Sequence, residues 1–113
     1  MTPWKQAVKL YLDGHKAQAL ESFVDAGLAA EDAGHDGKAR EIWEAVARRY
    51  ESSGPILERL ALCYERLALY DDAHATWRVA AAKYLDADHS DEAAHARARA
   101  RELRAFCLEH TGA

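Results

Sequence analysis

The amino-acid sequence predicts an all-α protein of about six helices. Half of the 113 residues are hydrophobic, and only 2 prolines and 6 glycines are available to interrupt regular structure. Alanine is abundant and β-branched residues are scarce, which favours helix over strand. Apolar residues also recur every three or four positions along most of the chain, the period of a helix with one buried face.

Three helices are predicted in the first half of the chain. The first spans residues 4–12, because Thr2 and Pro3 form a start signal and Asp13-Gly14 forms a stop. The second spans residues 16–33 and ends at Gly34, and the third spans residues 38–50.

Three further helices are predicted after Pro55. They span residues 55–68, 70–84 and about 90–109. The connection between the first two is so short that these helices must be antiparallel neighbours. Ser90 is a suitable N-cap for the last helix, and Asp91 and Glu92 complement the helix dipole in its first turn.

A repeat of constant period covers the middle of the chain. Four positions in residues 16–33 match four in 55–68, and three in 38–50 match three in 70–84. The matched pairs are Phe23 and Leu57, Ala26 and Leu60, Gly27 and Ala61, Ala30 and Tyr64, Ala39 and Ala73, Trp43 and Trp77, and Val46 and Ala80. The common spacing, ~34 residues, is that of a repeat made of one pair of helices.

The small and large residues of the repeat predict how the helices pack. Gly27 and Ala61 allow two helices to cross closely, while Trp43 and Trp77 fill the space between paired helices. This pattern resembles the tetratricopeptide repeat (TPR) family, whose repeat reads W-x2-L-G-x2-Y followed by A-x3-F. The resemblance implies antiparallel helical hairpins stacked as a short right-handed TPR-like α-solenoid.

The resemblance also implies a single domain with four parts. Residues 20–53 and 54–87 form two repeats, residues 1–19 hold an N-terminal flanking helix, and residues 88–113 hold a C-terminal capping helix. Both repeats lack the family's proline near their ends. An alternative grouping remains open, because Ala19, Phe23 and Ala26 also fit the family's second-helix spacing and would make the first two helices a divergent repeat.

The resemblance implies a groove lined by the first helix of each repeat, where the family binds peptides or helices. The positions that match the groove are Glu21, Val24, Leu28, Glu31, Asp32, Glu58, Leu62, Glu65 and Arg66. This face is acidic with an apolar floor, so a basic or amphipathic partner suits it by charge. The same carboxylates are also typical of a solvated helix face. We therefore expect a non-enzymatic protein-binding module, an adaptor or chaperone.

The last predicted helix carries two stripes that allow other functions. The apolar stripe consists of Ala96, Ala100, Leu103 and Cys107, and the basic stripe consists of Arg97, Arg101 and Arg104. The simplest interpretation is a cap with one polar side in water. The alternatives are a scaffold that assembles with copies of itself through its terminal helices, and contact with RNA. The absence of interleaved aromatic residues argues against RNA.

Other functions find little support in the sequence. Glu92 and His95 have the Glu-x-x-His spacing of di-iron bundles, but no second such pair occurs. The chain has no glycine-rich phosphate loop and no apolar run long enough to cross a membrane. Two distant cysteines, Cys63 and Cys107, indicate a reducing compartment. We therefore expect a cytoplasmic protein without catalytic residues, metal or cofactor.

Overall fold

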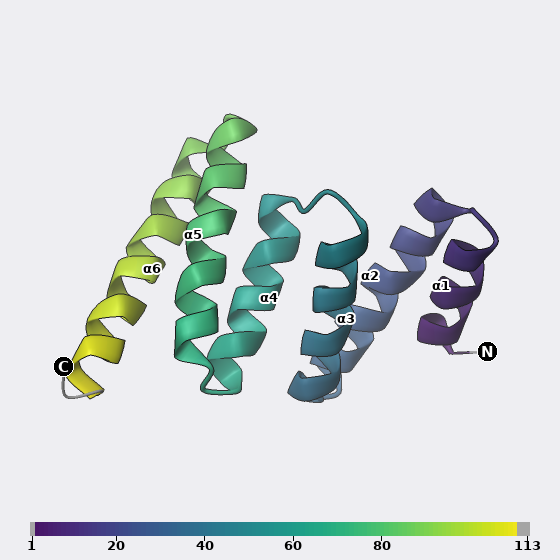
Figure 1. Ribbon diagram of the computed structural model, residues 1–113, viewed down its shortest axis with the longest axis horizontal. Helices are drawn as coiled ribbons and strands as arrows, with labels where there is room; N and C mark the ends of the chain where they lie inside the picture. Colours follow the sequence, from purple (N-terminus) through teal and green to yellow (C-terminus); the bar gives the residue numbers. More distant parts are fainter. Residues whose placement is uncertain (1, 111–113) are drawn as a thin grey trace. The chain divides into compact units, whose positions relative to one another are not determined.

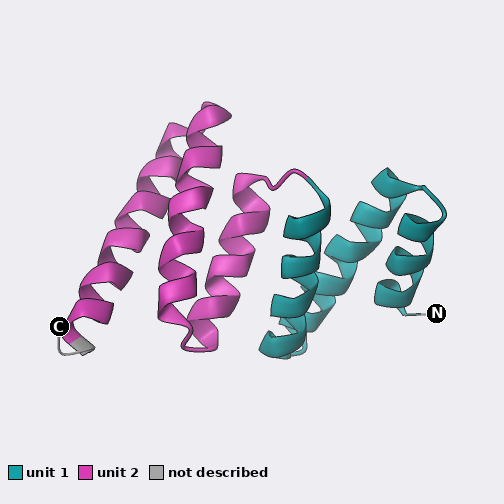
Figure 2. Cartoon of the chain, in the orientation of Figure 1, with its two compact units in different colours: residues 1–50 teal, residues 51–113 magenta. Residues whose placement is uncertain are grey.

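The structure is a computed structural model that describes residues 2–110, and these residues form an all-helical fold (Figure 1). Their six α-helices are α1 (Pro3–Leu12), α2 (Lys16–Asp32), α3 (Asp36–Arg49), α4 (Gly54–Arg66), α5 (Tyr70–Asp86) and α6 (Ser90–His110). The all-α prediction is therefore confirmed. The chain divides into two compact units, residues 1–50 and 51–113 (Figure 2). Each unit holds three of the helices.

Four turns of one kind make consecutive helices antiparallel within each unit. In each turn, one residue has a positive φ, and the next N–H donates to the carbonyl five residues earlier, as at the end of many helices. The residues with positive φ are Gly14, Gly34, Ala68 and Asp88. The donor and acceptor pairs are His15 and Leu10, His35 and Ala30, Leu69 and Tyr64, and His89 and Tyr84, at 2.8–2.9 Å.

The predicted helix ends agree with the structure to within two residues, and one predicted cap is wrong. The N–H of Ala93 donates to the carbonyl of His89 at 2.9 Å, so His89 occupies the N-cap position and Ser90 is already helical. The reason is the turn at Asp88, after which the chain enters the helix at once. His15 and His35 cap α2 and α3 in the same way.

Unit 1 is built around α2, which packs against both α1 and α3. The ring of Phe23 is buried and meets the rings of Trp4 and Tyr50 edge to face, at centroid distances of 5.4 and 6.3 Å. The hydroxyl of Tyr50 donates to the carbonyl of Lys16 at 2.8 Å and so ties the end of α3 to the start of α2. Both groupings that the sequence allowed, α1 with α2 and α2 with α3, are thus packed pairs.

Unit 2 has α5 at its centre, in contact with α4 and α6. Its core is rich in alanine, which lets the helices approach closely around the buried side chains of Trp77 and Tyr84. The buried members of this core are Leu57, Ala61, Ala73, Trp77, Ala80, Ala81, Tyr84, Ala93, Ala96, Ala100 and Leu103. Three residues of the predicted apolar stripe on α6 are therefore in the core, while Cys107 is only half-buried.

Candidate functional site

Two hydrogen bonds between a glutamate and a tryptophan recur in the two units. The indole N–H of Trp43 donates to Glu31 at 2.8 Å, and that of Trp77 donates to Glu65 at 2.7 Å. Both rings are buried, and a buried indole N–H needs an acceptor. Each glutamate lies on the first helix of its predicted repeat, and the second bond lies one repeat period after the first. Two of the carboxylates expected in the groove thus also accept hydrogen bonds from buried indoles of the core.

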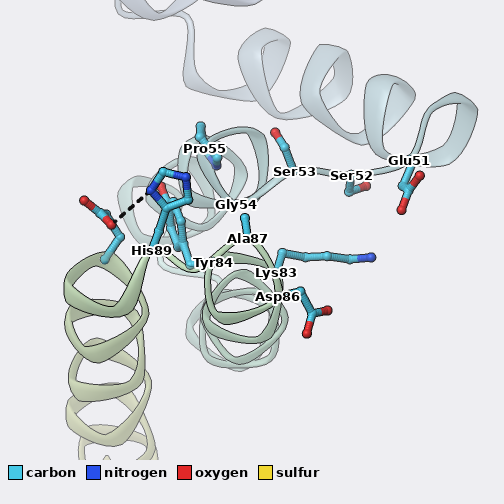
Figure 3. Close-up of a pocket in the computed structure, with 11 residues that line it drawn as sticks. Glu51, Ser52, Ser53, Gly54, Pro55, Lys83, Tyr84, Asp86, Ala87 and His89 are labelled. Carbon is cyan, nitrogen blue, oxygen red and sulfur yellow. Dashed lines mark ion pairs between the residues drawn. The ribbon is translucent and has the colours of Figure 1, made fainter.

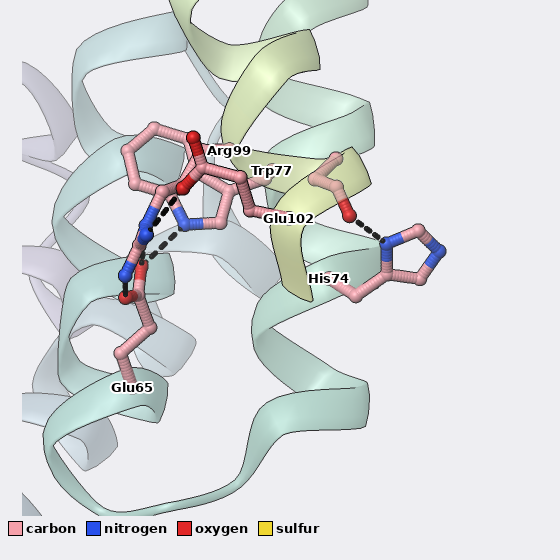
Figure 4. Close-up of polar contacts among 6 residues, drawn as sticks. Glu65, His74, Trp77, Arg99 and Glu102 are labelled. Carbon is pink, nitrogen blue, oxygen red and sulfur yellow. Dashed lines mark hydrogen bonds and ion pairs between the residues drawn. The ribbon is translucent and has the colours of Figure 1, made fainter. Parts of the chain in front are cut away.

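Glu65 is further tied to α6 by Arg99, as Figure 4 shows. The guanidinium of Arg99 donates to both carboxylate oxygens of Glu65 and, at 2.7 Å, to Glu102. These hydrogen bonds raise the pKa of Arg99 above its ordinary value, and the group stays charged. Sequence reasoning missed this contact, although Arg99 also follows Glu65 by one repeat period.

A pocket of about 390 Å³ lies beside this network on α4 and α6. Leu62, Trp77 and Ala98 supply its apolar lining, and polar groups come from both helices. The complete lining is Glu58, Leu62, Trp77, His95, Ala98, Arg99 and Glu102. The structure therefore places two predicted groove residues, Glu58 and Leu62, at one pocket.

The remaining predicted groove residues divide between the units. On α2 of unit 1, Val24 and Leu28 are half-buried, whereas Glu21 and Asp32 are exposed. In unit 2, Arg66 is exposed at the end of α4 and donates to the sulfur of Cys63 at 3.2 Å.

A second pocket of unit 2, about 670 Å³, lies where the segment before α4 meets the end of α5 (Figure 3). Besides Tyr84, its ionisable residues are Glu51, Lys83, Asp86, His89 and Glu92. His89 and Glu92 form an ion pair of 3.5 Å when the imidazole is protonated, and both side chains are at least half exposed. The side chains of Lys83 and Asp86 extend away from that pair (Figure 3). The charges therefore do not converge on one point.

The hydroxyl of Tyr84, which lines this second pocket, makes the stability of unit 2 depend on pH. Burial raises the pKa of its hydroxyl to about 12, and the hydrogen bond to Glu58 and the charges of Glu58 and Glu92 act in the same direction. The unfolded chain loses this proton near pH 10, while the folded chain keeps it, so stability must fall as pH rises from about 10 to 12.

Between pH 9 and 11.5, we expect the Tyr84→Phe protein to lose about 1–2 kcal/mol less stability than the parent protein, because it lacks the titrating hydroxyl. Urea unfolding of both proteins across this range measures the difference, and other groups that titrate cancel in it. Equal losses in the two proteins would contradict the expectation.

The basic stripe of α6 faces a third pocket of unit 2, about 460 Å³ in volume. Arg97, Arg101 and Arg104 all line it, together with Arg78 and His74 from α5. Sequence reasoning missed the two residues from α5, although the four-residue spacing of His74 and Arg78 puts them on one helix face.

Comparison with known proteins found no matching family model, no matching curated protein and no matching solved structure. Among residues 2–110, no cluster of three or more histidine, cysteine, aspartate or glutamate side chains could hold a metal ion. The described helices include none with the length and apolar character to cross a membrane.

Proposed function

We propose that the chain is a TPR-like protein-interaction module, an adaptor or chaperone without catalytic activity, that binds a basic or amphipathic segment of a cytoplasmic partner. The observation that carries this proposal is the pocket on α4 and α6, where the half-buried Leu62 lies among carboxylates. An apolar side chain of the partner would cover Leu62 and Ala98, and its basic side chains would reach Glu58 and Glu102.

The charge balance at this pocket favours a basic partner. Glu58 and Glu102 line the pocket, and Arg99, the one guanidinium in the lining, is also paired with Glu65 beside it. Glu58 accepts a hydrogen bond from Tyr84 at 3.1 Å, which holds the carboxylate in place without neutralising it. A lysine or arginine of a partner would therefore gain from charge complementarity here.

The TPR-like part of the proposal is supported by the recurrence of the same contacts. The Glu31–Trp43 and Glu65–Trp77 bonds are one repeat period apart, as are the small residues Gly27 and Ala61. In both units a pair of antiparallel helices thus uses one set of packing and hydrogen-bonding positions.

A pair of synthetic peptides tests the proposed function. Both are about 16 residues long, with leucine at helical spacing and either lysine or glutamate elsewhere. We expect the lysine peptide to bind the protein and Leu62→Arg to weaken that binding about tenfold, because the new cation repels the peptide and fills the pocket. Fluorescence anisotropy measures the affinity.

Leu108→Arg is the matched control, since Leu108 is 51% exposed on α6 and lines none of these pockets. Leu28→Arg tests whether the corresponding face of α2 takes part. Circular dichroism shows whether each variant is folded. Unchanged binding by a folded Leu62→Arg protein would refute the assignment of this pocket.

A further inference from the structure

We propose that unit 2 carries a second binding site of opposite charge on α5 and α6, and that this site takes an acidic amphipathic segment of a partner protein. The site is the third pocket, which we call the arginine pocket. It is lined by His74, Arg78, Ala81, Ala82, Leu85, Arg97, Ala100, Arg101 and Arg104.

The arginine pocket is built by two helices held in register. Arg97, Arg101 and Arg104 are spaced by four and three residues, so they share one face of α6 and extend over about 10 Å. Arg78 joins them from α5. The imidazole of His74 donates from Nδ1 to the carbonyl of Ala100 at 2.9 Å, which ties the two helices together at this level (Figure 4).

The four guanidinium groups of the arginine pocket have no anionic partner in the described part of the chain. Arg78, Arg97, Arg101 and Arg104 are all exposed, and none forms a hydrogen bond or ion pair with a residue of the range 2–110. No carboxylate lines the pocket. By contrast, Arg99 on the same helix is paired with two glutamates. The protein thus concentrates positive charge here although its net charge is −4.

The floor of the arginine pocket decides which kind of anion fits. Guanidinium groups match carboxylates and phosphates equally well in geometry. However, the floor is apolar, with Leu85 50% exposed beside Ala81, Ala82 and Ala100. A segment that presents apolar side chains between carboxylates would cover this floor and neutralise the arginines together.

RNA fits this site less well. A phosphate backbone would leave Leu85 in water, and the lining of the arginine pocket includes no phenylalanine, tyrosine or tryptophan on which a base could stack. Protein interfaces commonly combine apolar contact area with charged side chains, and both line this pocket. The observations therefore favour an acidic protein segment.

The glutamate peptide described above tests this proposal independently of the proposed function. We expect it to bind the protein, and we expect Arg97→Glu combined with Arg101→Glu to weaken that binding about tenfold or more, because attraction becomes repulsion. The lysine peptide should still bind this double variant, since its site is the pocket on α4 and α6. Lys9→Glu combined with Arg48→Glu is the control, because it makes the same change of net charge on exposed positions of unit 1.

A second pair of variants tests the apolar floor without changing any charge. Leu85→Ala should weaken binding of the glutamate peptide about threefold, whereas Leu108→Ala, at a position that is 51% exposed, should leave it unchanged. Loss of affinity in both variants, or in neither, would contradict a role for Leu85.

Three other results would overturn the proposal. The first is equal affinity of the protein for the glutamate peptide and for a peptide in which glutamine replaces glutamate. The charge of the arginines would then not contribute to binding. The second is binding of oligouridine that is abolished by the arginine double variant while the glutamate peptide does not bind. The third is self-association of the protein that only this double variant abolishes, since the occupant would then be a second copy of the chain.

Discussion

Replacing Trp77 with alanine is expected to lower the free energy of unfolding of unit 2 by about 4 kcal/mol. The indole is 1% exposed and lies in the core cluster beside Ala61, Ala73 and Ala80. These small neighbours cannot fill the cavity that the substitution leaves. The substitution also removes the N–H donor to Glu65, so that Arg99 becomes the main partner of that carboxylate.

Two measurements separate these contributions. Urea unfolding followed by circular dichroism gives the loss of stability, and hydrogen exchange with mass spectrometry shows whether it lies in α4–α6. Trp77→Phe keeps most of the ring but removes the donor, so we expect a smaller loss of about 1–2 kcal/mol. If Trp77→Ala cost no more than Trp77→Phe, the hydrogen bond rather than packing would dominate.

Adding one methyl group at Gly27 is expected to destabilise unit 1 by about 2 kcal/mol. A Cβ at this position would lie 2.5–2.7 Å from three atoms of the Trp43 ring. That ring is fully buried and hydrogen-bonded to Glu31, so moving it away would disturb both its packing and this bond. Alanine is a better helix former than glycine by about 1 kcal/mol, which offsets only part of the clash.

Gly37→Ala is the matched control, because this helical glycine has no atom within 4 Å of the position that its Cβ would take. We expect it to stabilise α3 by up to about 1 kcal/mol, opposite in sign to Gly27→Ala. Thermal unfolding of the two variants beside the parent protein tests the pair. A Gly27→Ala protein as stable as Gly37→Ala would show that Trp43 can shift.

Helix α6 does more than close the core of unit 2. Its buried face, with Ala96, Ala100 and Leu103, meets the core cluster. Arg99 and Glu102 line the pocket on α4 and α6, and the basic stripe lines the arginine pocket together with α5. The same helix therefore supplies one wall to each of two pockets of opposite charge. Its sequence, read alone, favoured a simple cap.

Local features were predictable because local residues determine them. The ends of α1 and α2 follow from Pro3, Gly14 and Gly34, which act within a few residues of where they stand. The repeat pattern assigned Gly27 to a close helix crossing and Trp43 to the space between paired helices, and the clash that a Cβ at Gly27 would have with Trp43 agrees with this prediction. Ala68 and Asp88 adopt a positive φ without being glycine, and their turns had weaker signals.

Contacts between helices were not predictable in the same way. The bond from Trp77 to Glu65 joins two helices, and periodicity within one helix carries no information about it. Arg99 lies on the same helix as the basic stripe, but only the packing of unit 2 brings it to Glu65.

The sequence by itself determined the helical class, the order and approximate ends of the helices, the repeat period and the residues of the basic stripe. The tertiary structure alone decided which charges are neutralised and which stay exposed. Arg99 and Arg101 are two residues apart on α6, yet one is paired with glutamates and the other lines the arginine pocket. The physical reason is that a helix turns about 200° over two residues, so neighbours in sequence meet different partners in space.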